Sequence, residues 1–429
     1  MKKIGLGLRL RRLHTANAWI FLLLTLSGIL LFLPPMRAWL GEGRVWLKQL
    51  HILAGLVSLA VLILYLPSML KHLRMMAGRS ARKGNLMAVL ILSTGWIGSG
   101  LVLWLYRMFP PSWNNTALLV HDLLTWLGVP YAMYHSITRM RWMSKAGREA
   151  AYIRPIHEGV GHTRSSFRVK PAQVMELGTY EPSSGKVFRS VSRRAFVRAG
   201  VGVVLAAAAI PLFIRWLSSV SGGSNLSKVQ DEEAIAARFP TPAPLSDSLP
   251  PIGGGAEGSF RIYTVTDIPK LSPEQWTFTV DGLVERPIQW NWNEFLAFPR
   301  QVQVSDFHCV TGWSVYKCTW EGIPLNRLLE HAGVKDGVKM VKFYSADGEY
   351  TDSITIEQTW MEDVMVVLML DGKLIPRDLG GPVRLVVPQM YAYKSVKWLN
   401  RIELIGEDHT GYWEQRGYAK DAWIWVKPM

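Results

Sequence analysis

Cysteine is scarce in this chain of 429 residues, which contains only Cys309 and Cys318. Two cysteines cannot build a disulfide scaffold or hold an iron–sulfur cluster, which needs about four protein ligands. Acidic residues are also outnumbered, 33 against 48 lysines and arginines, for a net charge of +15. The basic residues cluster between apolar runs. This is typical of cytoplasmic membrane loops, and it argues against nucleic acid as a partner.

Long apolar runs dominate the first half of the chain, and each approaches the roughly 20 residues that a helix needs to cross a bilayer. The sequence predicts five transmembrane helices, over residues 17–35, 50–70, 86–106, 117–138 and 195–217. Basic clusters before the first helix and between the second and third place both segments in the cytoplasm. An odd number of crossings then places everything after residue 217 outside, with membrane lipid as a partner.

A basic stretch from 146 to 194 separates the fourth and fifth predicted helices and is interpreted as a cytoplasmic linker. It runs into the sequence SRRAFVR at 192–198, which is followed by an apolar run. This order resembles a twin-arginine export signal, and an ordinary positively charged flank is the alternative. Such a signal implies export of a domain that is already folded around a cofactor. The pattern does not define whether the fifth helix is cleaved.

Four histidines lie within or at the ends of the predicted membrane helices, where an ionisable residue is a functional candidate. His121 and His135 share one face of a helix, because their separation of 14 positions is close to four turns, roughly 21 Å. At matched depths, His51 is level with His121 and His14 is level with His135. The pairing predicts an outer haem on His51 and His121 and an inner haem on His14 and His135. His72 is interpreted as an interfacial residue.

The order and spacing of the four paired histidines resemble the di-haem cytochrome b subunit of membrane formate dehydrogenases and related hydrogenases, over about residues 8–145. The resemblance implies two haem b groups and a quinone or quinol as the electron partner. Hydrogen-bonded packing histidines are the alternative interpretation. Residues 1–145 are therefore predicted to form a four-helix di-haem bundle in the membrane.

The second half of the chain has the mixed composition of a folded soluble domain. Residues 218–258, rich in Ser, Pro and Gly, are predicted to be a flexible tether. Beyond them, β-type runs alternate with turns, and one short helix is expected, which together predict a mixed, sheet-rich α+β domain over 259–429. The predicted strands are 276–280, 302–305, 340–344 and 383–387, and the predicted helix is 324–331.

Four motifs in this domain follow one another in a characteristic order: DFHCVTGWS at 306–314, WEGIPL at 320–325, GGPVRLVVP at 380–388 and KSVKW at 394–398. Together they resemble the sulfite oxidase molybdopterin domain, especially the catalytic subunit of periplasmic methionine sulfoxide reductases, over about residues 255–429. The resemblance implies a Mo-molybdopterin cofactor and oxygen-atom transfer. Cys309 matches the family's molybdenum ligand, and a thiolate suits a high-valent metal. Cys318 has no such match and is interpreted as a structural thiol.

Several positions that contact the cofactor in that family have matching residues in this sequence. They are cations, hydroxyl residues and main-chain donors, as an anionic pterin pyrophosphate requires. They are Tyr263, Thr264, Ser345, Arg384, Ser395, Val396 and Lys397. His308 is a candidate catalytic residue that stands where the exported branch has Arg, and Leu379 stands where that branch has a polar contact. These departures predict a different substrate pocket.

The sequence therefore predicts a multi-pass enzyme of the bacterial cytoplasmic membrane with an extracytoplasmic molybdopterin domain. Electrons from quinol would pass through the haems and remove oxygen from a small oxidised or sulfur-containing substrate, such as a sulfoxide. The chain stops soon after GYWE at 411–414, without the dimerisation domain of typical sulfite oxidases, which favours the reductase branch. Two alternatives stay open: a sulfite dehydrogenase that feeds electrons to quinone, and a membrane electron carrier whose outer domain only binds a partner.

Overall fold

The computed structural model describes residues 6–33, 36, 39–40, 43–75, 80–139, 193–221 and 239–424. Nearly all of the predicted linker at 146–194 and much of the predicted tether at 218–258 lie outside the described residues. The side chains of His72, Arg193 and Arg194 lie outside them as well. The chain divides into two compact units, one made of Met1–Thr125 with Ile214–Met429 and the other of Trp126–Phe213.

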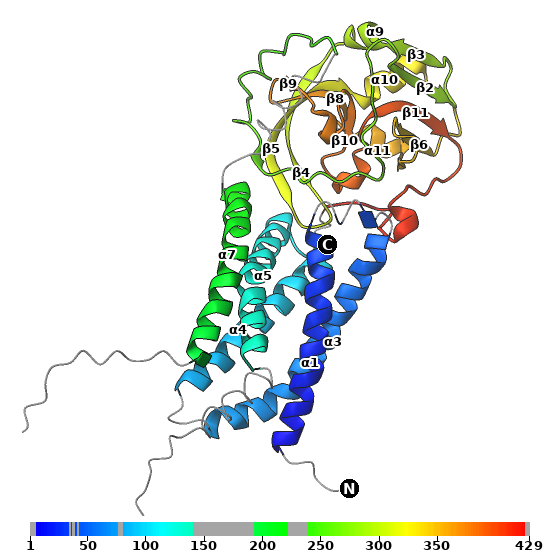
Figure 1. The fold of residues 1–429 in the computed structure, drawn as a ribbon. Helices are drawn as coiled ribbons and strands as arrows, with labels where there is room; N and C mark the ends of the chain where they lie inside the picture. The colour runs from blue at the N-terminus through cyan, green and yellow to red at the C-terminus, as the bar shows by residue number, and fades with distance from the viewer. Residues whose placement is uncertain are drawn as a thin grey trace, which may run out of the picture. The chain divides into compact units, whose positions relative to one another are not determined.

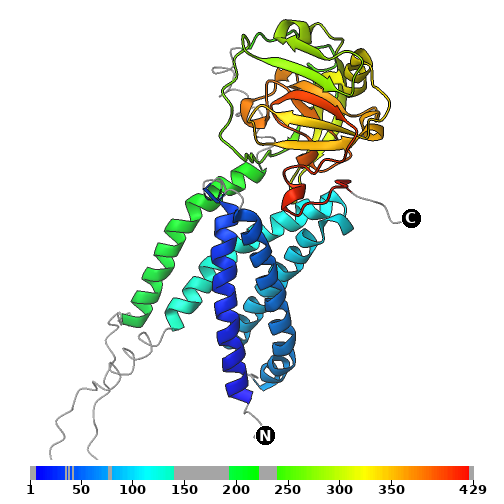
Figure 2. The same cartoon turned by 90° about the vertical axis from the view of Figure 1, so that its right-hand side faces the viewer.

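Long helices open the first unit: α1 (Leu6–Phe32), α3 (Gly43–Met75) and α4 (Ser80–Trp104). After the short helix η1 (Tyr106–Met108), α5 (Pro111–Arg139) begins in the first unit and ends in the second. Figures 1 and 2 show from two directions that α1 runs beside α3, which also contacts α4. Helices are the expected outcome for these apolar runs, because every main-chain polar group inside them is bonded within its own segment.

Four of the described helices are long and apolar enough to cross a membrane: Arg11–Phe32, Gly43–Lys71, Lys83–Trp104 and Phe196–Ile214. Large apolar side chains on these helices face outward. Trp19 of α1 is 69% exposed, and Ile63 of α3 is 60% exposed. A helix with this much exposed apolar surface is suited to lipid rather than to water.

The predicted crossing at 117–138 is helical, and α5 is long enough at 29 residues, but it is not among the four helices that are apolar enough to cross a membrane. The reason lies in polar side chains such as Asn114, His121 and Asp122, which lower its mean hydropathy. The described helices thus offer four candidate crossings where the sequence predicts five. Because the outside location of everything after residue 217 depended on five crossings, it stays a prediction.

In the second unit, the end of α5 packs against α7 (Arg193–Ser221). The rings of Trp126 and Phe213 meet edge to face with centroids 6.3 Å apart. Gly202 of α7 faces Tyr134 of α5 so closely that an added Cβ would lie 3.9 Å from the ring. Small and aromatic residues therefore define this helix contact.

The C-terminal domain contains two β-sheets. The first is antiparallel and runs β1 (Glu257–Gly258), β5 (Ser314–Pro324), β8 (Met365–Leu370), β10 (Arg384–Val386), with β4 (Gln301–His308) paired to β5 and β9 (Lys373–Leu374) paired to β8. The second runs β3 (Ile288–Asn291), β2 (Thr277–Gly282), β11 (Leu399–Ile405), β6 (Met340–Ser345), β7 (Thr351–Thr355), and only β11 and β2 pair in parallel.

The predicted mixed α+β architecture of this domain is confirmed, with β2, β4, β6 and β10 at the predicted strands and α10 (Leu325–Ala332) at the predicted helix. Strand β8, with the sequence MVVLML, is buried along its whole length because it lies between β5 and β10 with both faces covered. Short helices complete the domain: α9 (Trp292–Leu296), α11 (Ile356–Thr359), η2 (Arg377–Leu379), η3 (Ala392–Lys394) and η4 (Glu414–Arg416), of which α9 and α11 are labelled in Figure 1.

Candidate functional site

Cys309 lies on a tight turn between β4 and β5. Its main-chain N–H donates to the Trp313 carbonyl at 2.9 Å, and the Gly312 N–H donates to the Cys309 carbonyl at 2.9 Å. Gly312 has a φ of +97°, and a Cβ there would come within 2.7 Å of a side-chain atom of Leu103. Glycine is therefore required both for the backbone conformation and for the close packing. The turn holds the half-buried Cys309 thiol in one position.

Neighbouring groups act on the charge of the Cys309 thiol in opposite directions. Burial raises the pKa of the Cys309 thiol, whereas the Thr311 hydroxyl, 3.2 Å from Sγ, and the cations Arg261 and Lys48 act to lower it. A metal that replaces the thiol proton would keep the sulfur as a thiolate despite its partial burial. The two cations are well placed to favour that charged form.

His308 does not supply positive charge beside the cysteine as the Arg of the related branch would. Its Nδ1 lies 2.8 Å from the Ser314 hydroxyl, and its Nε2 lies 3.9 Å from the Asp306 carboxylate. Burial lowers the pKa of His308, with Asp306 acting against the shift. The cations near the thiol are instead Arg261 and Lys48, which the sequence motifs did not reveal because both lie far from Cys309 along the chain.

Arg384 is buried and Lys397 is half-buried, and within the described ranges neither forms an ion pair with a carboxylate, although Asp378 and Asp347 act on the charge of Lys397. Arg384 donates to the carbonyl oxygens of Leu379 at 2.6 Å and Ser395 at 3.0 Å, and Lys397 donates to the Asp378 carbonyl at 3.1 Å. Burial lowers the pKa of Arg384 to about 10, and burial with the Arg384 charge lowers the pKa of Lys397 to about 7. Two cations that repel each other, of which Arg384 has no carboxylate acting on it, favour the binding of an anion.

Gly380 lets the two cation-bearing segments approach each other. Its φ is +104°, and a Cβ there would lie 2.7 Å from the Cβ of Lys397. The Trp398 N–H donates to the Gly380 carbonyl at 2.9 Å, which joins the segment after β9 to the segment before β11. Leu379, which replaces a polar contact of the related branch, takes part through its main-chain carbonyl rather than its side chain.

The other predicted cofactor residues from the second half of the domain border these cations. The Ser395 hydroxyl accepts a hydrogen bond from the Val387 N–H at 3.0 Å, and Val396 is 1% exposed. Ser345, at the end of β6, is paired with Leu399 of β11 and so lies beside the segment that carries Lys397. The hydroxyl of Ser345 accepts a hydrogen bond from a main-chain N–H at 3.3 Å.

One apolar cluster brings the cysteine turn and the predicted early segment together. Tyr263 and Cys309 both pack against buried residues that include Phe307. The guanidinium of Arg384 lies 4.8 Å from the centre of the Phe307 ring. Phe307 precedes Cys309 by two positions in the sequence. Thr264 is half-buried next to Tyr263. Cys309 and Arg384 therefore border the same apolar cluster, and Arg384 and Lys397 together are called the predicted cation cradle below.

The first unit also brings His51 of α3 and His121 of α5 together. Their ring centroids are 6.3 Å apart and their planes are inclined by 69°. Each ring contacts a buried serine through Nδ1: Ser27 Oγ lies 2.8 Å from His51, and Ser99 Oγ lies 3.0 Å from His121. Two imidazoles from separate helices thus face each other with one nitrogen of each ring already engaged.

The second predicted pair is not tested in the same way. His14 lies in the first unit and His135 in the second, so their pairing stays a prediction. In the second unit the His135 ring lies 6.3 Å from the Tyr131 ring, in a tilted arrangement. Within the described ranges no three or more His, Cys, Asp or Glu side chains gather into a metal-binding group.

The family described as "Oxidoreductase molybdopterin binding domain" matches residues 265–413. An uncharacterized oxidoreductase of Bacillus subtilis, YuiH, is 33% identical to this chain over 168 residues, which are 38% of this chain and 84% of that protein. The chain belongs to this family. It is a molybdopterin oxidoreductase of the sulfite oxidase type.

Further relatives of this molybdopterin oxidoreductase carry methionine sulfoxide reductase names. The catalytic subunit MsrP of Campylobacter jejuni is 23% identical over 239 residues, 52% of this chain and 76% of that protein. A putative protein-methionine-sulfoxide reductase subunit of Azospira oryzae is 30% identical over 156 residues, 36% of this chain and 59% of that protein. The chain thus spans less than two thirds of the Azospira protein.

The molybdopterin oxidoreductase domain fits its cofactor on two structural grounds. The neighbouring charges of buried Arg384 and half-buried Lys397 suit a phosphate group that is taken out of water. The sulfur of Cys309, which is half-buried and lies 3.2 Å from the Thr311 hydroxyl, suits a metal that needs one soft protein ligand. Both features come from residues that the sequence motifs singled out.

If Arg384 and Lys397 bind the phosphate of the pterin, Lys397→Met should weaken retention of the cofactor. A hydrogen bond to a charged group is worth about 1.5–3 kcal/mol, which is roughly a 10- to 150-fold loss of affinity. The apoprotein should not lose much stability, because the change removes a charge that forms no ion pair and that Arg384 repels. The pterin content of purified protein measures the effect, and Lys335→Met, on an exposed loop, is the control. Wild-type pterin content in Lys397→Met would contradict the cradle.

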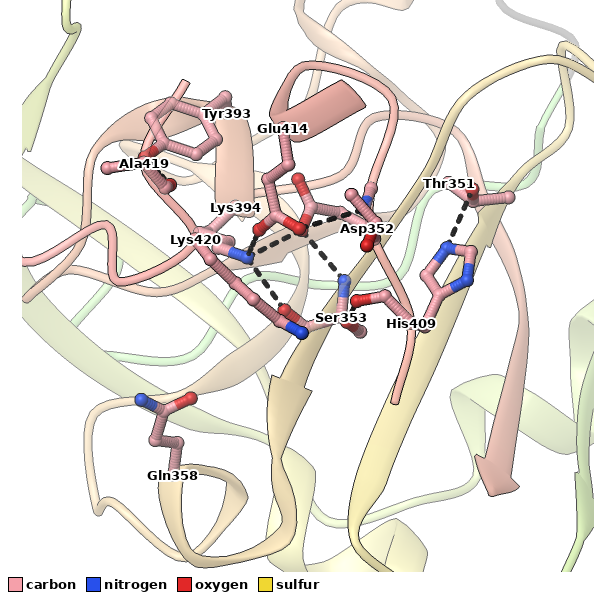
Figure 3. Close-up of polar contacts among 12 residues, drawn as sticks. Thr351, Asp352, Ser353, Gln358, Tyr393, Lys394, His409, Glu414, Ala419 and Lys420 are labelled. Atoms are coloured by element: carbon pink, nitrogen blue, oxygen red, sulfur yellow. Dashed lines mark hydrogen bonds and ion pairs between the residues drawn. The ribbon is translucent and has the colours of Figure 1, made fainter. Parts of the chain in front are cut away.

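The molybdopterin oxidoreductase domain also contains a buried ion network that the sequence did not predict. Lys394 donates to Asp352 at 2.8 Å, to the Ser353 carbonyl at 2.8 Å and to Glu414, as Figure 3 shows. The three charged side chains are at most 2% exposed. Burial raises the pKa of Asp352 to about 6, although Lys394 acts against the shift. Since Lys394 precedes Lys397 by three positions, the network holds the segment that carries the cradle.

Proposed function

We propose that this chain is a membrane-bound, molybdenum-dependent oxidoreductase that passes electrons between the quinone pool and an oxygen-atom-transfer site at Cys309. In the direction that we favour, the site reduces an S-oxide or a similar small substrate. The main support is one observation: a single chain holds a half-buried thiol on which two cations act, Arg261 and Lys48, together with two facing imidazoles on long helices.

At the transfer site, the residues of this chain would bind and orient. Cys309 would hold the metal through Sγ, with the Thr311 hydroxyl at 3.2 Å keeping the sulfur in place. Arg384 and Lys397 would bind the phosphate of the pterin, which supplies the oxygen-accepting metal when bound. Arg261 and Lys48, the cations that act on the thiol, would attract a substrate oxygen that carries partial negative charge.

The facing pair of His51 and His121 supports a haem between two helices. A metal held by two imidazoles at roughly 2 Å on each side leaves the ring centroids about 6 Å apart. The observed separation of 6.3 Å leaves that space. The inner haem on His14 and His135 belongs to the same proposal, and so does a quinol as the electron donor.

We infer a location in the bacterial cytoplasmic membrane with the molybdopterin domain on the extracytoplasmic side. The four apolar helices support membrane insertion. The sequence SRRAFVR at 192–198 supports export by the twin-arginine route. The relatives named as methionine sulfoxide reductases support S-oxide reduction over the reverse reaction.

Purified full-length protein, a reduced quinol analogue and a panel of S-oxides and N-oxides test this function. We expect turnover of at least one S-oxide, by protein that holds one molybdenum and two haem irons per chain. Protein that contains molybdenum and haem but turns over no S-oxide or N-oxide would contradict the reductase assignment. Reduction of the haems on addition of sulfite, followed optically, would assign the opposite direction of electron flow.

A further inference from the structure

Ser27 and Ser99 make matching contacts with the two facing imidazoles. Ser27 belongs to α1 and lies 2.8 Å from Nδ1 of His51, while Ser99 belongs to α4 and lies 3.0 Å from Nδ1 of His121. Both serines are buried, 2% and 7% exposed. Each histidine is therefore held by a helix other than its own.

The proton arrangement of each contact follows from the second bond that each serine makes. A serine hydroxyl has one proton to donate. Ser27 donates it to the Leu23 carbonyl at 2.7 Å, and Ser99 donates it to the Gly95 carbonyl at 2.8 Å. Each serine oxygen is then left to accept, so the Nδ1–H of the imidazole must be the donor.

This arrangement fixes the tautomer of both histidines. With the proton on Nδ1, the lone pair lies on Nε2, which is the form of imidazole that binds a metal. A ligating histidine that donates its other N–H to an oxygen is held in orientation and becomes a stronger electron donor to the metal. His51 and His121 show this second bond in the protein alone, on opposite sides of a 6.3 Å gap.

We propose that Ser27 and Ser99 are positioning residues that hold His51 and His121 as Nε2 ligands and lower the reduction potential of the haem iron between them. The proposal rests on the haem assignment made above. Its physical reason is that the Nδ1–H to oxygen bond adds electron density to the ring, which favours the oxidised iron.

The test measures the haem in Ser27→Ala, Ser99→Ala and the double variant, prepared as full-length protein. We expect one of the two haem midpoint potentials to rise in each single variant and to rise further in the double variant. The low-spin ferric EPR signal of the same haem should shift as well. Ser58→Ala is the matched control, because Ser58 is on the helix of His51 but donates to Asn17 at 3.2 Å.

Threonine variants separate the hydrogen bond from packing. Thr94 shows that a threonine on α4 makes the same bond to the carbonyl four residues earlier, at 2.7 Å. Ser27→Thr and Ser99→Thr should therefore restore the wild-type potential, or restore haem if an alanine variant loses it. Haem-loaded alanine variants with unchanged potentials and EPR signals would overturn the serine proposal and leave the haem assignment intact. Protein without any haem bound at His51 and His121 would overturn the haem assignment itself.

Discussion

Cys309→Ser is expected to lower S-oxide turnover by more than about 100-fold. Removal of a residue that only supports a metal ligand costs about 10- to 100-fold, and Cys309 is proposed to be the ligand itself. In the proposed function, the Cys309 sulfur is the one protein atom that binds the molybdenum. Pterin content should persist, since Arg384 and Lys397 remain, and the haem spectrum should be unchanged. Steady-state turnover with a quinol analogue, normalised to molybdenum and haem content, is the measurement.

Cys318→Ser is the matched control for this substitution. Cys318 is the other cysteine of the chain, is fully buried, and its Sγ lies 3.8 Å from the Val315 carbonyl. Its loss should alter packing but leave turnover per molybdenum close to wild type. Equal losses in the two variants, or undiminished turnover in Cys309→Ser, would show that Cys309 does not hold the reacting metal.

Lys394→Met is expected to destabilise the molybdopterin domain by about 3–5 kcal/mol, because it leaves two buried carboxylates without their cation. The same change should release pterin, since Lys394 anchors the segment of Ser395 and Lys397. Loss of pterin on heating, followed alongside unfolding of the full-length protein, measures both effects. Lys420→Met is the control: Lys420 pairs with Asp408 at the surface, where side chains are 42% and 72% exposed, and little change is expected there.

A variant in which all three network residues are uncharged tests whether unpaired charge causes the instability of Lys394→Met. Adding Asp352→Asn and Glu414→Gln to Lys394→Met removes the unpaired charge, so part of the lost stability should return. If the triple variant is less stable than Lys394→Met alone, the network acts through hydrogen-bond geometry rather than through charge compensation.

Local patterns predict the secondary structure well, and they single out Cys309 as a metal ligand, which stays a prediction. The helices and the named strands form where the sequence predicts them, because apolar runs and alternating patterns decide those elements locally. Cys309 could be singled out because its whole motif is contiguous. The count of membrane crossings was less reliable, since polar residues on α5 lower its hydropathy without interrupting the helix.

The residues that sequence reasoning missed act through tertiary contacts. Lys394 meets Asp352 and Glu414 only after η3, β7 and η4 have packed together. Lys48 and Arg261 act on Cys309 from distant segments, and no spacing rule connects them. The contact of His51 with His121 matches the pairing expected from membrane depth, while haem binding by the pair stays a prediction.

The proposed function requires that electrons move within this one chain between the imidazole-bound haems and the metal on Cys309. Its most direct test is to reduce the haems of the purified protein with a limiting amount of quinol analogue, add an S-oxide, and follow the haem absorbance. We expect the haems to be reoxidised in the wild type and to stay reduced in Cys309→Ser. Haems that stay reduced with every S-oxide tested, or that reoxidise equally fast without the Cys309 sulfur, would contradict it.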